Sequence, residues 1–142
     1  GFTWYELSNW SKEFGESKHN IAYWLNKNWW GAGPGAHSHI HGKRWWNVKH
    51  PNLYREKLEQ NISPELDSEV LEPIQIESER LMLSIRLPEG ITKKSLSEDQ
   101  ISSLYQYLQS GALDKAKWDA GSVSLTLNGR LIADRIVREI LL

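Results

Sequence analysis

Apolar and polar residues alternate along some stretches of this chain and recur at helical spacing along others, which predicts a mixed α and β fold. Alternation over residues 123–127, and the aromatic and β-branched residues of 2–7, are typical of strands. Residues 38–48 have the pattern of a hairpin with Gly42 in the turn, and residues 29–33 that of a further strand. Helical spacing is found over residues 19–25, 52–60, 69–87, 98–110 and 131–140.

Start and stop signals support several of these helices. Ser97 is followed three residues later by Gln100, which is a capping-box pattern, and Gly111 follows the last apolar position of that helix. Pro51 stands where the first turn of another helix would begin. Over residues 69–87 the apolar stripe is wide, so we expect this helix to be well buried.

The predicted elements of the back half follow the order of a winged helix: helices, a short strand, a turn at Asn128–Gly129 and a closing helix. A DNA-binding domain of this kind needs a basic face. Residues 92–142 carry seven basic and six acidic side chains, which are interleaved rather than clustered. Specific DNA binding is therefore disfavoured, and no nucleic-acid partner is expected.

Composition limits the classes of function that remain open. The chain has 142 residues, 39% of them hydrophobic and 25% charged, which suits one folded domain or a small domain with part of another. A net charge of −1 provides no general attraction to nucleic acid or to an anionic membrane. Without cysteine, the chain forms no disulfide and offers no thiolate ligand. No apolar run is long enough for membrane insertion, and we expect a soluble, cytoplasmic protein.

The composition also changes along the chain. Seven of the eight tryptophans lie within the first 46 residues, and all five histidines within the first 50. Residues 1–60 carry eight basic and five acidic side chains, whereas residues 61–91 carry two and seven. We therefore predict a domain boundary near residues 61–64, which separates segment 1–60 from segment 61–142.

A glycine-rich stretch, Trp-Trp-Gly-Ala-Gly-Pro-Gly-Ala-His-Ser at residues 29–38, is the strongest candidate for a binding loop. Glycine lets a backbone approach another group closely, because no Cβ is in the way. A phosphate-binding loop would continue with lysine and serine or threonine, which are missing here. A ligand-free turn therefore remains as open as a binding loop for a ligand other than a nucleotide phosphate.

Three histidines follow at alternate positions, His37, His39 and His41. On one strand they would share a face, and neutral imidazoles placed in this way can bind zinc. However, residues 17–55 contain no carboxylate, and Gly42 indicates that His41 lies in a turn. Solvated or hydrogen-bonded histidines are thus favoured over a metal site, and no metal-ligand set is assigned.

Several ordered blocks resemble one known family. The blocks in the front half are WYELSNW at 4–10, GESKHNIAYW at 15–24, GAGPGAHS at 31–38 and RWWN at 44–47. The blocks in the back half are ERLML at 79–83, RL at 86–87, EG at 89–90 and LTLNGRL at 125–131. Together they resemble the second half of radical S-adenosylmethionine (radical SAM) proteins related to oxygen-independent coproporphyrinogen III oxidase, nearest to the heme-chaperone (HemW-type) branch.

This resemblance implies a fold and a site. Segment 1–60 would hold the last strands of a partial TIM-like barrel, and segment 61–142 a mostly helical, winged-helix-like C-terminal domain, in an α+β or α/β fragment. The glycine-rich stretch would lie at a strand end against S-adenosylmethionine, where ligands of such barrels bind. Gly33, Gly35, Ala36 and His37 are the expected cofactor-binding residues, and no catalytic residue is assigned.

The family holds a [4Fe-4S] cluster through three cysteines, and this chain has none. We therefore expect a C-terminal fragment that is inactive alone and retains no cofactor; a natural short relative is the alternative. The longer parent protein would use S-adenosylmethionine and the cluster in heme metabolism, as a heme chaperone or in the oxidative decarboxylation of coproporphyrinogen III.

The resemblance also implies partners. The tetrapyrrole would be heme or a porphyrinogen, and His37, His39, His41 and His50 are the candidate ligands of heme iron. A protein that receives the heme is a possible further partner. The alternative is a non-catalytic module that binds a protein or heme.

Overall fold

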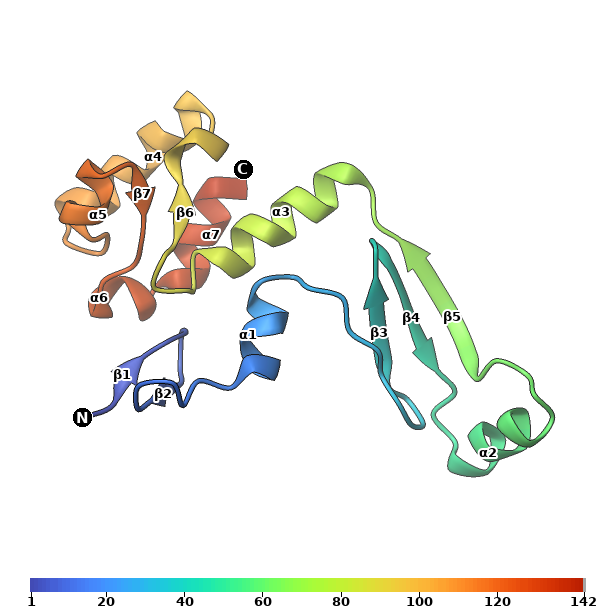
Figure 1. Cartoon of the computed structure of the whole chain (residues 1–142). Coiled ribbons are helices and arrows are strands. Elements are labelled where there is room, and N and C mark those ends of the chain that lie inside the picture. Colours follow the sequence, from blue (N-terminus) through green and yellow to red (C-terminus); the bar gives the residue numbers. More distant parts are fainter. Residues whose placement is uncertain (142) are drawn as a thin grey trace. The chain divides into compact units, whose positions relative to one another are not determined.

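The computed structural model describes residues 1–141 and is shown in Figure 1. Its helices are α1 (Lys18–Trp24), α2 (Pro51–Glu59), α3 (Pro73–Ser84), α4 (Glu98–Gln109), α5 (Lys115–Asp119), α6 (Leu127–Arg130) and α7 (Ala133–Leu141), with a 3-10 turn at Lys93–Ser95. Its strands are β1 (Thr3–Trp4), β2 (Trp10–Ser11), β3 (His37–Ile40), β4 (Lys43–Asn47), β5 (Glu65–Val70), β6 (Ile91–Thr92) and β7 (Ser122–Val123). These elements form two compact units: residues 1–26 with 78–142, and residues 27–77.

The first unit has the larger apolar core, built around α4 and α7. Helix α7 buries Ile136, Val137 and Ile140, while Arg135 and Arg138 on its other face are exposed. This pattern follows the helical period, and it places the apolar stripe of α7 against α4. The short β6–β7 pair lies in the same unit, and Ile91 and Val123 of these strands are fully buried in the core.

Local signals define α4 as the sequence predicts. The Ser97 Oγ accepts a hydrogen bond from the backbone N–H of Gln100, and the Gln100 side chain accepts one from the backbone N–H of Ser97. These two bonds satisfy amide groups that have no partner inside the helix. The helix ends before Gly111, which has a φ of 74°. The predicted capping box and glycine stop are thus confirmed.

The N-terminal hairpin also belongs to the first unit. Only Thr3–Trp4 forms a strand, paired with Trp10–Ser11, so the strand predicted over residues 2–7 is shorter than expected. The guanidinium carbon of Arg130 lies 4.5 Å from the ring centre of Trp4 and 5.2 Å from that of Trp10. These cation–π contacts connect the hairpin to α6 and supply the stabilisation that a two-residue strand pair lacks by itself.

The second unit is a three-stranded antiparallel sheet in the order β3-β4-β5, with α2 in the connection between β4 and β5 (Figure 1). Ile40 pairs with Lys43, so His41 and Gly42 form a two-residue turn with φ values of 50° and 80°. Two positive φ values are those of a type I′ hairpin turn. The predicted hairpin and the helix that starts at Pro51 are both confirmed.

Side chains of this sheet divide between two faces, because neighbouring residues of a strand point to opposite sides. Lys43 and Trp45 share one face with their partners Ile40 and Ser38. Arg44 and Trp46 share the other face with their partners His39 and His37. The two faces carry different chemistry: one carries the histidines, and the other carries an aromatic pocket.

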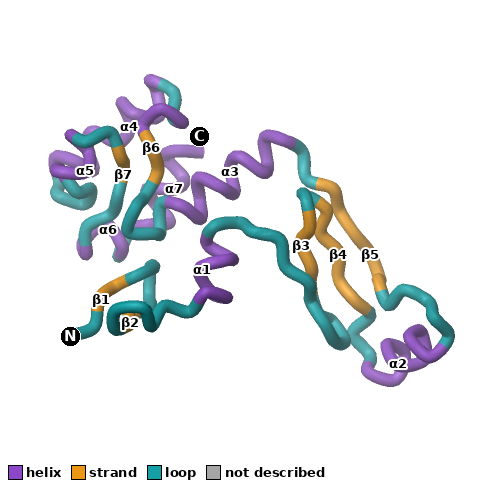
Figure 2. Tube along the Cα trace, viewed as in Figure 1, coloured by secondary structure: helices purple, strands orange, loops and turns teal. Residues whose placement is uncertain are grey.

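Three predicted elements differ from the structure. The helix predicted over residues 69–87 is shorter, because residues 69 and 70 belong to strand β5 (Glu65–Val70) and α3 covers only Pro73–Ser84. Ile74 of this helix is 73% exposed rather than buried. Leu127 was expected to end a strand and to be followed by a turn at residues 128–129, but it begins helix α6. The Thr126 Oγ1 accepts a hydrogen bond from the Gly129 N–H and so caps the first turn of this helix. Residues 29–33 contribute one isolated bridge, between Trp29 and His39. Most of residues 25–36 is irregular backbone, drawn as loop in Figure 2.

Candidate functional site

The glycine loop, which we define as residues 31–36, is held by hydrogen bonds within its own unit. The Gly31 N–H donates to the Ser38 Oγ at 2.9 Å, and the Gly33 N–H donates to the Tyr54 hydroxyl at 3.1 Å. The Gly35 N–H donates to the carbonyl of Val48 at 2.9 Å. These three amides already have partners, so the loop is not organised as an anion cradle built from backbone N–H groups.

The side chain of Asn47 holds the same loop by bonding to the loop's backbone carbonyl groups. Its Nδ2 donates to the carbonyl oxygens of Gly33 at 2.9 Å and Gly31 at 3.4 Å. Asn47 is 4% exposed and the two glycines are partly buried, so water competes only weakly for these bonds. Asn47 is thus the polar anchor of the loop, and Tyr54 is its counterpart from α2.

Two glycines of the loop have different reasons to lack a side chain. A Cβ on Gly31 would lie 2.8 Å from the carbonyl carbon of His37 and closer still to its oxygen, so this glycine is required for packing. A Cβ on Gly33 would meet no atom within 4 Å, and the φ of Gly33 is 109°. Gly33 therefore presents an open backbone surface, which a flat or bulky cofactor can approach closely.

The predicted cofactor-binding residues lie between this open surface and the start of strand β3; they are Gly33, Gly35, Ala36 and His37. His37 is exposed at the end of the loop, and its ring stacks on Trp46 with centroids 5.8 Å apart and an interplanar angle of 29°. The structure thus gives the loop an accessible surface and an imidazole beside it. The assignment of these four residues to S-adenosylmethionine stays a prediction.

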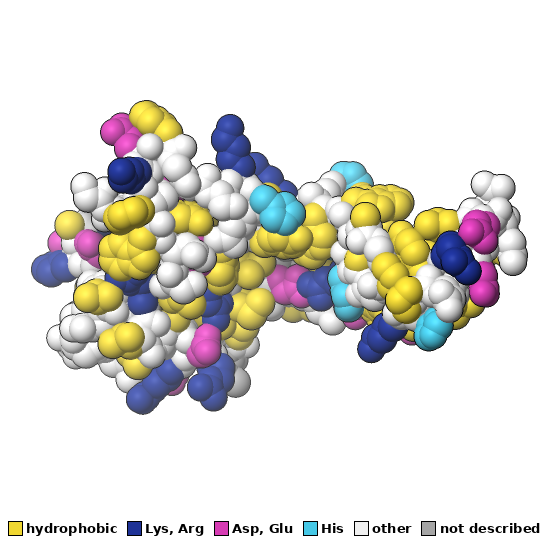
Figure 3. All heavy atoms as spheres, turned by 90° about the horizontal axis from the view of Figure 1, so that it is seen from below, with side chains coloured by type: hydrophobic (Ala, Val, Ile, Leu, Met, Phe, Trp, Pro, Cys, Tyr) yellow, Lys and Arg dark blue, Asp and Glu magenta, His cyan; other side chains and the backbone are white. Residues whose placement is uncertain are grey.

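The candidate heme ligands differ in accessibility. His37, His41 and His50 are exposed, whereas His39 is 4% exposed and its ring packs edge-on against Trp29 at 4.7 Å. Histidine side chains, cyan in Figure 3, reach the surface. His37 and His39 share a face of β3, but His41 lies in the turn, where its N–H donates to the Asn28 Oδ1 at 2.9 Å. The expectation that His41 lies in a turn next to Gly42 is therefore confirmed.

Within residues 1–141, no group of three or more histidine, cysteine, aspartate or glutamate side chains is arranged to hold a metal ion. The full sequence contains no cysteine, so the thiolate ligands of a [4Fe-4S] cluster are missing and the cluster does not fit this chain.

Among the described helices, none has the length and apolar character needed to cross a membrane.

A fifth histidine, His19, has the accessibility that an axial ligand needs and was not among the sequence candidates. It lies in the first turn of α1, is exposed, and meets the Tyr23 ring edge-on at 4.9 Å. The signal in the sequence was the spacing of four residues between His19 and Tyr23, which places the two rings on one side of a helix.

Replacing Asn47 with alanine should destabilise the second unit by about 2 kcal/mol, because two partly buried carbonyls lose their donor. Asn47→Asp should cost at least as much, since it keeps the size but sets an oxygen against both carbonyls. Asn52→Ala, at an exposed position of α2, is the control and should change little. Urea unfolding followed by tryptophan fluorescence measures all three, and equal midpoints for Asn47→Ala and wild type would show that the bonds do not hold the loop.

Comparison with known proteins places the chain in a family. No family model matches the chain. It is 42% identical to the "Heme chaperone HemW" of Mycobacterium tuberculosis over 141 residues, which cover 99% of this chain and 35% of that protein. It is 34% identical to the "Heme chaperone HemW" of Bacillus subtilis over 142 residues, covering 96% of this chain and 37% of that protein.

Among solved structures, the coproporphyrinogen III oxidase HemN of Escherichia coli matches with a TM-score of 0.61. The match covers 88% of this chain and 34% of the HemN chain, and its 13% identity makes it evidence of a shared fold alone. The chain thus spans about a third of the length of these three proteins. The match to HemN shows the shared fold, and the identities to the two HemW proteins show that the chain belongs to the HemW-like radical SAM family and corresponds to its C-terminal part.

Proposed function

We propose that this chain is the part of a longer radical SAM protein that contributes to handling a tetrapyrrole, and that the longer protein is a heme chaperone. The observation that carries the proposal is the 42% identity to a heme chaperone over 99% of the chain, which includes the glycine loop and its anchors. Oxidative decarboxylation of coproporphyrinogen III is the other activity that the family offers, and its support is the shared fold with HemN. We expect this role in the cytoplasm.

The glycine loop is the proposed contact for S-adenosylmethionine, through Gly33, Gly35, Ala36 and His37. Its support is the open backbone surface at Gly33 and the anchoring of the loop by Asn47 and Tyr54. When bound to a cluster, the cofactor supplies radical chemistry. The cysteines for that cluster would come from another part of the longer protein, and the residues here would orient the cofactor and shield one side of it.

The exposed histidines are the proposed ligands of heme iron. An axial ligand needs an accessible imidazole nitrogen. This condition favours His37, His41 and His50, adds His19, and places His39 last because its ring is buried against Trp29. His37 is the first choice, since it stands beside the glycine loop and its stacking on Trp46 limits its rotation.

Hemin titration of the purified chain tests this proposal. We expect a saturable, shifted Soret band, and about tenfold weaker binding, equivalent to about 1.4 kcal/mol, when the liganding histidine becomes alanine. Single variants of His19, His37, His41 and His50 should identify that residue. Free imidazole should restore the spectrum of the affected variant, which separates a lost ligand from a damaged fold.

The alternative is a non-catalytic module that docks a recipient protein. The specific observation in its favour is a pair of exposed leucines on the first unit, Leu127 at 64% and Leu131 at 80% exposure. They are four residues apart, which places them on one side of this helical turn, where they could contribute to an apolar contact surface. This alternative predicts tight association with a recipient protein and no saturable Soret shift with hemin.

A further inference from the structure

A concave site lies entirely within the second unit, on the sheet face opposite the one that carries His37. Its volume is about 420 Å³, and its walls include Trp30, Trp45, Tyr54, Leu58 and Pro64. Strand β4 supplies Trp45, and helix α2 supplies Tyr54 and Leu58. A cavity of this size with aromatic walls is of the kind that encloses a small organic molecule.

The walls of this pocket leave apolar surface open to solvent. Trp30 is 72% exposed, although its ring contacts Trp45 edge-on with centroids 5.2 Å apart. Leu58 is 47% exposed. An exposed indole stabilises a complex when a guest covers it, because covering apolar surface is favourable by about 25 cal/mol per Å². The open face of Trp30 is therefore the natural contact surface for a guest.

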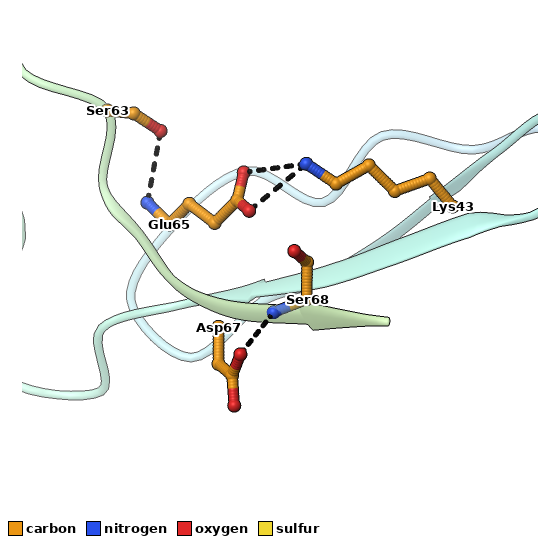
Figure 4. A network of polar contacts seen from close by, with 5 residues as sticks. All are labelled: Lys43, Ser63, Glu65, Asp67 and Ser68. Carbon is orange, nitrogen blue, oxygen red and sulfur yellow. Dashed lines mark hydrogen bonds and ion pairs between the residues drawn. The ribbon is translucent and has the colours of Figure 1, made fainter. Parts of the chain in front are cut away.

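One ion pair sits in the pocket lining. The Lys43 Nζ donates to the two carboxylate oxygens of Glu65 at 3.1 and 3.3 Å, as Figure 4 shows. The same Nζ lies 5.6 Å from the ring centre of Trp45. The hydrogen bond from Lys43, and then that from Ser68, hold the pKa of Glu65 below its usual value. The ammonium group of Lys43 thus already occupies the position beside Trp45 that a cationic ligand would take.

This arrangement selects the chemistry of the guest. A cationic guest would compete with Lys43 for both Trp45 and Glu65, so it is disfavoured. A flat apolar body suits the indole and phenol walls, which bind rings by stacking and edge contacts. An ammonium group has three N–H donors, so Lys43 can donate a further hydrogen bond to a second carboxylate at the pocket edge. The complementary guest is flat and aromatic, and it carries a carboxylate.

We propose that this pocket binds the edge of a carboxylate-bearing porphyrin, with Trp30 against the ring and Lys43 on a propionate. The choice of a porphyrin among flat aromatic acids rests on the proposed function. The site does not depend on iron, because its described lining contains no histidine. It is therefore separate from the histidine ligation proposed above.

The pocket and the glycine loop share two residues. Asn47 and Tyr54 both line the pocket, and both hold the backbone of Gly33 by hydrogen bonds. A guest in the pocket therefore contacts the two side chains that fix the loop.

Titration with metal-free coproporphyrin III, followed by its fluorescence anisotropy, tests the proposal. Wild type should bind saturably, Trp30→Ala should bind about tenfold or more weakly, and Lys43→Gln about fivefold more weakly. Trp10→Ala is the matched control, since Trp10 is 53% exposed and outside the pocket, and it should bind as wild type does. A tetracationic porphyrin of similar size should bind poorly.

The outcomes separate this inference from the proposed function. No binding of the metal-free porphyrin, or equal binding by Trp30→Ala and wild type, overturns the inference even if hemin gives a histidine-dependent Soret shift. Porphyrin binding that depends on Trp30 and Lys43 supports it, even if hemin gives no such shift. Trp30 is largely exposed, so its replacement is expected to leave the fold intact.

Discussion

Replacing Gly31 with alanine should unfold the second unit, at a cost of about 3 kcal/mol or more. The new Cβ would lie 2.8 Å from the carbonyl carbon of His37 and closer to its oxygen. Both are backbone atoms of strand β3, which cannot move without breaking its pairing with β4. Urea unfolding monitored by tryptophan fluorescence measures the loss, because four tryptophans, at residues 29, 30, 45 and 46, lie in this unit.

Gly33→Ala is the matched control for this prediction. A Cβ there meets nothing within 4 Å, so only the φ of 109° opposes it, at a cost of about 1–3 kcal/mol. The two substitutions separate steric exclusion from backbone strain within one loop. Equal losses of stability would show that close packing at Gly31 is not what fixes the loop.

Replacing Gly90 with alanine should have a comparably large effect on the first unit, about 3 kcal/mol or more. A Cβ on Gly90 would lie 2.7 Å from the carbonyl carbon of Val123, and the φ of Gly90 is 69°. Val123 pairs with Ile91, and both side chains are buried in the core, so the strands cannot separate to make room. Thermal unfolding followed by circular dichroism measures the expected fall in Tm.

The control for Gly90 is Gly121→Ala, just before strand β7. Its φ is 91°, but a Cβ there meets nothing within 4 Å. We expect a smaller fall in Tm than for Gly90→Ala. If Gly121→Ala lowers the Tm as much, the contact with Val123 is not the cause of the loss.

Local hydrogen-bond patterns were predictable from the sequence. The capping box of Ser97 and Gln100 depends on residues three apart, so the sequence contains both partners within one window. The same is true of the hairpin turn, which needs only positive φ at His41 and Gly42.

Elements that depend on distant partners were not predictable in the same way. Residues 65–70, Glu-Leu-Asp-Ser-Glu-Val, have few strand-forming residues, so the sequence predicted no strand there and extended the following helix back to Glu69. They form β5 because β4 pairs with them; the ion pair of Arg44 with Glu69 at 3.3 Å joins the two strands. This pairing overrides the weak local preference.

The candidate site was predicted in part. Glycine spacing and the neighbouring histidine indicated the loop, because these residue types carry the chemistry directly. Its anchors were missed, since Asn47 and Tyr54 reach Gly33 from 14 and 21 residues away along the chain. The spacing of histidines likewise gave no information on burial, which distinguishes His39 from His37 only after the sheet has formed.

Optical titration and electron paramagnetic resonance on the unmodified chain should give the stoichiometry and the iron ligation of bound hemin. We expect saturation at about one hemin per chain, with the spectrum of histidine-ligated iron. Unsaturable binding of many hemins without a histidine signature would contradict the proposal that this chain contributes to tetrapyrrole binding in the longer protein.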